Sequence, residues 1–309
     1  MKNFINNPMS PSTYVNLMSD SGFKSVYLDR ANKHLLIELI NCILPENAHV
    51  KDIVSYDDRE RDPDMVSGKR TFLDLVCVGD DGRTFSVEVQ GAAEEGFFER
   101  CLFYACDIYR RELEPGKLYS ELKPVYVIAI TNYAMKHTDE SQWDTDNFIS
   151  SYGFTELRTG DFAPSTIFLN FAEVGRFTKT LEECTSDRDY LVYWFLNGWK
   201  YDKNTIPEEL DAKSITKHLC QACEIAAFTS EKRTLYNKAI MNERDIQAQK
   251  DYAVKEALAE GKAEGLAEGE TKGKAERELE IARNMLAEGM NKVLICKITG
   301  LSEDALRNL

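Results

Sequence analysis

Hydrophobic and polar residues alternate with two different periods along the chain, and their order predicts helices packed on a sheet. Apolar residues recur at helical spacing over residues 35–43, and Pro45 ends this helix. Residues 49–58 alternate as a strand does, and two more strands flank a turn at residues 79–82. A helix then covers residues 94–114. This order of elements is typical of a sheet with helices on its faces.

The next segment completes the predicted sheet. Residues 123–133 form a nearly continuous run of β-branched residues, the pattern of a central strand that is buried on both faces. Residues 147–154 and 165–174 also have strand patterns and extend the sheet to about residue 175. The fold class we expect is therefore α/β (α+β), with a mixed central sheet flanked by helices.

From residue 181 onward the apolar patterns are helical, which predicts an all-helical C-terminal region. We divide the chain into an N-terminal extension (1–19), a core (20–178), a helical region (179–250), and a Gly/Glu/Lys-rich helical linker with a C-terminal helical hairpin (251–309).

The linker contains a stripe of glycines at four-residue spacing, which keeps them on one narrow side of a helix. They are Gly261, Gly265, Gly269 and Gly273. Each glycine inside a helix costs about 1 kcal/mol relative to alanine. The stripe is typical either of a solvated helical linker or of a close helix–helix contact in a homo-oligomer.

The last residues predict a short helix, a turn and a second short helix, in the manner of a helix-turn-helix hairpin. The second helix has Arg307 as its one basic residue. This favours packing or oligomerisation over reading of the DNA major groove.

Composition narrows the function classes. The 309 residues include 38 Lys and Arg against 52 Asp and Glu, which gives a formal net charge of −14. Nonspecific nucleic-acid affinity comes largely from basic side chains that neutralise phosphates, so any DNA contact is expected to be local. No apolar run reaches the roughly 18 residues of a membrane helix, and the N-terminus has no secretory signal pattern. We therefore expect a cytoplasmic protein without a membrane span.

Five of the eight cysteines lie in apolar runs, which predicts reduced and buried thiols; they are Cys42, Cys77, Cys101, Cys106 and Cys184. One C-x-x-C pair, Cys220 and Cys223, lies in a predicted helix without a second pair or a histidine pair at zinc spacing. A structural role is therefore favoured over a metal or redox site.

The stretch "FLDLVCVGDDGRTFSVEVQ" fixes its own strand register, because its apolar residues must meet on one face. A three-residue loop at residues 80–82, with Gly82 in a left-handed conformation, pairs apolar residues with apolar residues. A two-residue turn would shift the register by one and place apolar residues opposite polar ones. The expected pairs are Leu73 with Val89, Leu75 with Val87, Cys77 with Phe85, and Gly79 with Arg83.

On the other face, this register places Asp74 opposite Glu88, with Gln90 two residues further along. Directly opposed side chains have Cβ atoms about 4.5–5.5 Å apart. Two carboxylates at this separation repel unless a cation or a proton lies between them, and oxygen ligands select Mg²⁺ or Mn²⁺ over zinc. The alternative is a solvated sheet face, on which water screens the pair.

The motifs of the chain resemble, in order, those of the PD-(D/E)xK nuclease family of transposase-like proteins, relatives of the recombination-promoting nucleases. The resemblance covers nearly the whole chain and rests on "DSGFKSVY", "KRTFLDLVCVGDDGRTFSVEVQ", "FFERCLFYACDIYRREL", "LKPVYVIAITNY" and "EGKAEGLAEG". It implies a restriction-endonuclease-like core and metal-dependent cleavage of DNA.

By this resemblance, Asp74 matches the aspartate of the second core strand and Glu88 matches the acid of the (D/E)xK motif. Gln90 takes the place of the lysine, which would orient the attacking water and offset phosphate charge. The implied catalytic residues are Asp74, Glu88 and Gln90. The implied ligands of Mg²⁺ or Mn²⁺ are Asp74, Glu88 and the backbone carbonyl of Val89.

The resemblance also implies DNA contacts. Arg100 and Tyr104, one helical turn apart, match the fourth motif on the helix behind the site. Their alternative roles are a surface arginine and a tyrosine at the edge of the core. Lys24, and Lys69 with Arg70 just before the Asp74 strand, are further candidates for contact with the DNA backbone.

The resemblance, together with the paired acids, implies a Mg²⁺-dependent DNA endonuclease that hydrolyses phosphodiester bonds and is linked to mobile elements or recombination. The alternative is a nuclease-fold protein with little or no catalysis that acts as an oligomeric DNA- or protein-binding module. The matched acids favour the first, whereas Gln90 and the acidic charge favour the second. The expected partners are DNA and further copies of the chain, bound through the C-terminal helices.

Overall fold

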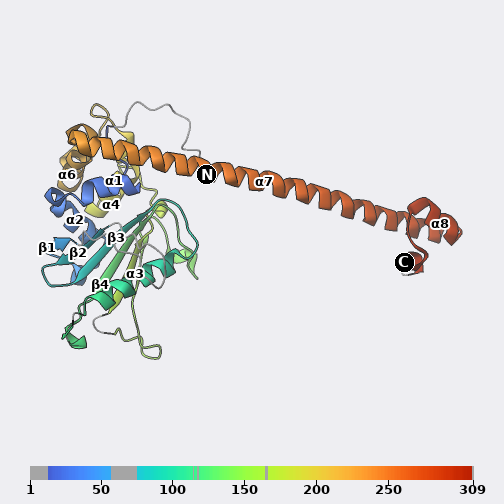
Figure 1. The fold of residues 1–309 in the computed structure, drawn as a ribbon, viewed down its shortest axis with the longest axis horizontal. Coiled ribbons are helices and arrows are strands. Elements are labelled where there is room, and N and C mark those ends of the chain that lie inside the picture. Colours follow the sequence, from blue (N-terminus) through green and yellow to red (C-terminus); the bar gives the residue numbers. More distant parts are fainter. Residues whose placement is uncertain (1–12, 57–74, 114, 117, 164–165, 308–309) are drawn as a thin grey trace. The chain divides into compact units, whose positions relative to one another are not determined.

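The computed structural model describes residues 13–56, 75–113, 115–116, 118–163 and 166–307 (Figure 1). The predicted site residues Asp74, Lys69 and Arg70 lie outside these described residues. The chain divides into two compact units, residues 1–239 and residues 240–309. Each unit is described by itself.

A six-stranded mixed sheet forms the centre of the first unit, as the sequence predicts. Its spatial order is β1-β2-β3-β4-β6-β5, in which β3, β4 and β6 are parallel and the other neighbours are antiparallel. The strands are β1 (Ile53–Tyr56), β2 (Leu75–Gly79), β3 (Thr84–Gln90), β4 (Val125–Thr131), β5 (Ile149–Tyr152) and β6 (Ile167–Ala172).

Helices cover both faces of this sheet, with α3 on one face and α1, α2 and α4 on the other (Figure 1). The helices of the first unit are α1 (Asp20–Tyr27), α2 (Lys33–Ile43), α3 (Phe97–Arg111), α4 (Asp187–Asn197), α5 (Glu208–Ala212) and α6 (Ser214–Cys223). Short 3₁₀ turns lie between these elements, among them η4 (Glu140–Gln142) after β4 and η5 (Val174–Arg176) after β6.

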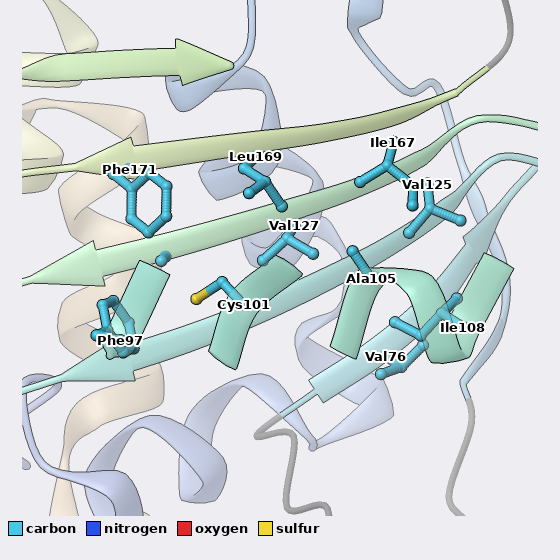
Figure 2. Close-up of a cluster of buried hydrophobic side chains, with 11 residues drawn as sticks. Val76, Phe97, Cys101, Ala105, Ile108, Val125, Val127, Ile167, Leu169 and Phe171 are labelled. Atoms are coloured by element: carbon cyan, nitrogen blue, oxygen red, sulfur yellow. The ribbon is translucent and has the colours of Figure 1, made fainter. Parts of the chain in front are cut away.

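The core beneath α3 joins this helix to β4 and β6, two of the three parallel strands, and to β2 (Figure 2). Phe97, Cys101, Ala105 and Ile108 recur at helical spacing along α3 and are buried. They pack against alternate residues of the strands, which point to one face because side chains alternate along a strand. Those residues are Val76, Val125, Val127, Ala129, Ile167, Leu169 and Phe171.

The described part of the β2–β3 hairpin has the predicted register, whereas Leu73, the predicted partner of Val89, lies outside the described residues. Leu75 pairs with Val87 and Cys77 pairs with Phe85. The backbone N–H of Gly79 donates to the carbonyl of Arg83 at 2.9 Å, which closes a three-residue loop. Gly82 has a φ of 81°, a left-handed conformation that glycine adopts without steric strain.

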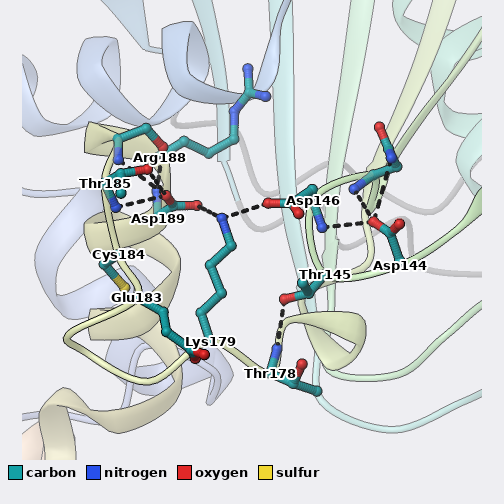
Figure 3. Close-up of polar contacts among 12 residues, drawn as sticks. Asp144, Thr145, Asp146, Thr178, Lys179, Glu183, Cys184, Thr185, Arg188 and Asp189 are labelled. Carbon is teal, nitrogen blue, oxygen red and sulfur yellow. Dashed lines mark hydrogen bonds and ion pairs between the residues drawn. The ribbon is translucent and has the colours of Figure 1, made fainter.

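The chain between β4 and β5 is tied to α4 by one lysine (Figure 3). The Nζ atom of Lys179 lies 2.6 Å from Asp146 and 3.0 Å from Asp189. Burial opposes the charge of Asp189, but hydrogen bonds from the backbone N–H groups of Thr185 and Ser186 outweigh it and lower its pKa to about 2. These contacts fix the segment that leads into the edge strand β5.

The second unit is helical. Helix α7 (Ser230–Ala287) begins in the first unit and continues into the second, which also contains α8 (Lys292–Thr299) and α9 (Glu303–Arg307). Ala282, Ile295 and Leu306, one from each helix, form a small buried cluster. Apart from the neighbouring backbone of its own helix, a methyl group at any glycine of the stripe would contact no described atom within 4 Å.

Candidate active site

The candidate active site is built at the end of β3, on the face that α3 covers. Glu88 lies near the C-terminal end of β3 and pairs with Ala129 of the parallel neighbour β4. It is 5% exposed, so the alternative of a solvated sheet face does not apply to this carboxylate. Gln90 is the last residue of β3 and is partly exposed on the same face. The pleat therefore directs both side chains toward α3.

Arg100 of α3 draws the polar side chains together. Its Nη2 atom lies 2.7 Å from Oε1 of Glu88 and 3.1 Å from Oε1 of Gln90. Its Nη1 atom lies 2.5 Å from Oε2 of Glu94, in the loop before the helix. The guanidinium group also lies over the ring of Phe97, 4.9 Å from the ring centroid. One cation therefore holds two carboxylates and one amide.

The local sequence explains why Arg100 reaches β3. Gly96 has a φ of 75° and ends the loop, so α3 starts at Phe97 directly after it. Phe97 and Cys101 are buried against the sheet. Because α3 turns once every 3.6 residues, Arg100 lies beside these two residues, at the border between the core and solvent.

The electrostatics of the cluster are set by burial. Burial raises the pKa of Glu88, and the charge and hydrogen bond of Arg100 oppose this rise. Burial opposes the charge of Arg100, but Glu88 and Glu94 outweigh it and raise the arginine pKa. The Sγ atom of Cys101 lies 4.0 Å from Oε2 of Glu88, and burial raises the pKa of this thiol. Glu88 is therefore a carboxylate whose charge depends on a nearby cation.

The other described residues that the sequence predicts for the site are Val89, Tyr104 and Lys24. Val89 is in β3 between Glu88 and Gln90 and is buried. Tyr104 lies one turn after Arg100 and is partly buried, which raises its pKa. Lys24 of α1 forms an ion pair with Asp20 at 2.5 Å, and its charge is among those that lower the pKa of Glu88. The structure thus brings Glu88, Gln90 and Arg100 into direct contact.

Two residues of the cluster were missed by the sequence reasoning, Glu94 and Tyr133. The parallel register pairs Gln90 with Thr131, and the N–H of Asn132 donates to the carbonyl of Gln90 at 3.0 Å. Tyr133 therefore follows β4 beside the cluster, where burial raises its pKa to about 12. A prediction that β3 and β4 are parallel neighbours would have placed Tyr133 here. Glu94 carries no such signal, because it lies in a loop.

The donor atoms fit a hard divalent cation. The atoms around the Arg100 guanidinium are carboxylate and amide oxygens, and oxygens are the ligands that Mg²⁺ and Mn²⁺ prefer. Within the described residues, no group of three His, Cys, Asp or Glu side chains is spaced to hold a metal ion. Asp74, the second acid that the sequence predicts for this site, lies outside the described residues.

Comparison with known protein families gives two matches, which together cover most of the chain. A model of the PD-(D/E)XK nuclease family transposases matches residues 17–253. A model of the C-terminal HTH domain of the Rpn/YhgA-like nuclease family matches residues 275–309, which include the end of α7, α8 and the described part of α9. The searches of curated proteins and of solved structures returned no significant match. Nucleases of this kind typically use divalent metals.

The two matches agree with the fold and with the order of the motifs. Both family descriptions point to a nuclease that binds DNA, and the second names a helix-turn-helix domain where the sequence predicts a hairpin. None of the described helices is long and apolar enough to cross a membrane. Because the first model covers more than half of the chain, the protein belongs to the PD-(D/E)XK nuclease family transposases.

Proposed function

We propose that this protein is a metal-dependent DNA endonuclease that hydrolyses phosphodiester bonds, in a process linked to mobile elements or recombination. The observation that carries the proposal is the contact of Glu88 and Gln90 with Arg100, in a chain of this nuclease family. A buried acid with a raised pKa beside a fixed cation is typical of functional sites.

Asp74, Glu88 and the carbonyl of Val89 would hold the metal ion, Mg²⁺ or Mn²⁺. When bound, the ion lowers the pKa of a water molecule and neutralises charge at phosphorus. The role of Glu88 is to present a carboxylate oxygen whose surroundings exclude bulk water, since its side chain is 7% exposed. Poor solvation makes an ionised Glu88 depend on a cation, which favours metal binding.

Gln90 and Arg100 together supply what the lysine of the motif would supply. Gln90 has hydrogen-bonding groups but no charge, and its Oε1 accepts from Arg100 while its Nε2 donates to the carbonyl of Ala92 at 2.9 Å. These two bonds fix the amide orientation. Arg100 adds the positive charge, which would attract an oxygen of the scissile phosphate. Gln90 would orient the attacking water.

The remaining proposed DNA contacts come from one residue of α3, one of α1 and two that precede Asp74. Tyr104 lies beside Arg100 on α3, and Lys24 of α1 acts electrostatically on Glu88. Lys69 and Arg70 precede Asp74 in the sequence. With a net charge of −14, the chain should bind DNA weakly and with strong salt dependence when the metal is absent.

Nicking of supercoiled plasmid in the presence of Mg²⁺ or Mn²⁺ tests the proposal. Asp74→Ala and Glu88→Ala should each abolish nicking, whereas Glu99→Ala, an exposed acid on α3, should retain it. Equal nicking by the parent and the Asp74 and Glu88 variants would refute the assigned site.

The second candidate function is an oligomeric DNA- or protein-binding module of the same fold. The glutamine at position 90 favours it, because glutamine lacks the charge of the lysine in the motif. This alternative would be established if neither the parent nor any variant nicks the plasmid while the parent still binds a labelled duplex.

Oligomerisation through the C-terminal helices is part of both proposals. Gel filtration of the chain with and without residues 250–309 tests it. An unchanged oligomer size after truncation would refute a role of these helices in assembly.

A further inference from the structure

A pocket of about 380 Å³ lies between the edge strand β5 and the segment that follows β4. The proposed cleavage mechanism uses none of the residues around it. The residues that define its chemistry are Lys136, His137, Gln142, Trp143, Ser150 and Tyr152. Its size is in the range of small-ligand sites.

The wall of this pocket is held in place by a buried carboxylate. Glu173, which follows β6, is 0% exposed. Its Oε2 accepts from the backbone N–H of Met135 at 2.8 Å, and its Oε1 lies 2.6 Å from Nε2 of His137. Arg176 donates to Glu173 at 2.7 Å and to the carbonyl of Met135 at 2.6 Å. A site with side chains fixed in this way loses little entropy when a ligand binds.

The pocket presents aromatic surfaces together with neutral hydrogen-bonding groups. The ring of His137 is stacked on that of Trp143, with centroids 3.9 Å apart and an interplanar angle of 14°. Because the His137 side chain is only 7% exposed, Trp143 and Tyr152 supply the aromatic surface that a ligand can reach. Tyr152 lies on the β5 side of the pocket. The charges of its lining, Lys136 and Asp139, balance each other, which disfavours a phosphate as the main ligand. A flat ring with hydrogen-bonding edges, such as a nucleobase, matches this lining.

The pocket wall begins beside the candidate active site. Thr131 pairs with Gln90, and the segment that follows leads from Asn132, which is bonded to the Gln90 carbonyl, to Trp143. On the other side, the ring of Tyr152 lies 5.1 Å from that of Phe98 in α3, the helix that carries Arg100. The pocket is therefore joined through both of its walls to the elements that carry Gln90 and Arg100.

We propose that the pocket binds one unpaired nucleobase of a single-stranded segment of the nucleic-acid substrate, by stacking on the aromatic side chains. This choice of ligand rests on the proposed nuclease function. The aromatic face accepts any base, because every base has a π-face, so the contact selects for strand structure more than for sequence.

The test uses the full chain in EDTA, so that binding is measured without cleavage. The ligands are a short single-stranded oligodeoxynucleotide, the duplex of the same sequence, and deoxyadenosine monophosphate. The readouts are tryptophan fluorescence and the anisotropy of a labelled oligonucleotide. We expect the single strand to quench the fluorescence and to bind more tightly than the duplex.

Substitutions of Trp143 assign the effect to the pocket. Trp143→Ala should weaken binding of the single strand roughly 5- to 100-fold, the loss expected for one stacked base. Trp143→Phe should retain most of the affinity but lose the quenching, while Trp199→Phe, outside the pocket, should retain both. Thermal melts of each variant show whether the fold is intact.

Unchanged affinity of Trp143→Ala would overturn the inference, as would equal binding of duplex and single strand. If deoxyadenosine monophosphate binds as tightly as the oligonucleotide, the ligand of the pocket is a free nucleotide and not a nucleic-acid strand. This result would also overturn the inference. These outcomes are separate from the nicking assay. Nicking without any effect of Trp143 on binding refutes the pocket alone, and binding that depends on Trp143 without nicking refutes the proposed catalysis alone.

Discussion

The Nη2 atom of Arg100 lies 2.7 Å from Oε1 of Glu88. The glutamate side chain is 7% exposed and the arginine side chain is 26% exposed, so the pair lies at the border of the core. The energy of such a pair is dominated by the cost of leaving one charge buried without the other. Four consequences of this arrangement and of the fold can be measured.

The first concerns the coupling of the two residues. Arg100→Gln should lower the free energy of unfolding by about 3 kcal/mol, the lower end of the range for breaking a buried pair, because Arg100 is partly exposed. The loss should be smaller when Glu88 is already Gln, with a coupling energy of about 1–3 kcal/mol. Denaturant unfolding of both single variants and of the double variant measures this cycle.

Glu99→Gln, on the exposed side of α3, is the matched control and should change the stability by less than about 0.5 kcal/mol. Additive effects of the substitutions at positions 88 and 100 would contradict the coupling.

The second concerns pH. Since the pKa of Glu88 is raised in the folded protein, the folded state binds this proton more tightly than the unfolded state does. Its contribution to stability is therefore most favourable below the ordinary glutamate pKa and declines as pH rises through the raised value. As pH rises from the ordinary glutamate pKa to the raised pKa of Glu88, the free energy of unfolding of the parent should fall relative to that of Glu88→Gln. Above the raised pKa the difference should stay constant. A difference that increases with pH would contradict the raised pKa.

The third concerns the metal. A ligand that binds only the folded state stabilises it by about 2.7 kcal/mol at a concentration 100 times its dissociation constant. Saturating Mg²⁺ or Mn²⁺ should therefore raise the melting temperature of the parent, and EDTA should reverse the shift. Glu88→Gln should show a much smaller shift. Equal increases in melting temperature for the parent and Glu88→Gln would show that the metal does not bind at Glu88.

The fourth concerns two glycines in different surroundings. Gly82→Ala should lower the free energy of unfolding by about 1–2 kcal/mol, because alanine is strained at a φ of 81°. Gly265 lies in a helix, and an added methyl group would meet no described atom within 4 Å apart from the neighbouring backbone of that helix. Gly265→Ala should therefore stabilise the helix by up to about 1 kcal/mol. Circular dichroism melts measure both.

A decrease in oligomer size caused by Gly265→Ala, seen by gel filtration, would show instead that the glycine stripe packs against a second copy of the chain. Gly82→Ala serves as the control in that measurement, since it lies in the hairpin loop of the first unit.

The hairpin and the general architecture could be predicted because the residue patterns that specify them lie within short, continuous segments of the sequence. Alternation of apolar residues on two adjacent strands leaves only one register that buries them together, and Gly82 specifies the loop. The observed pairs, Leu75 with Val87 and Cys77 with Phe85, follow from that pattern. The same alternation placed Glu88 and Gln90 on one face of β3. The motif order likewise predicted the family.

The surroundings of Glu88 depend on contacts between distant segments, which no local pattern specifies. The packing of α3 on the sheet brings Arg100 to Glu88, and the parallel pairing of β3 with β4 brings Tyr133 beside them. Glu173 meets His137 because β6 and the end of β4 are neighbours in the sheet, although 36 positions separate the two residues. Periodicity shows which face of an element is buried, whereas the partner that covers this face is selected by the packing of the whole core.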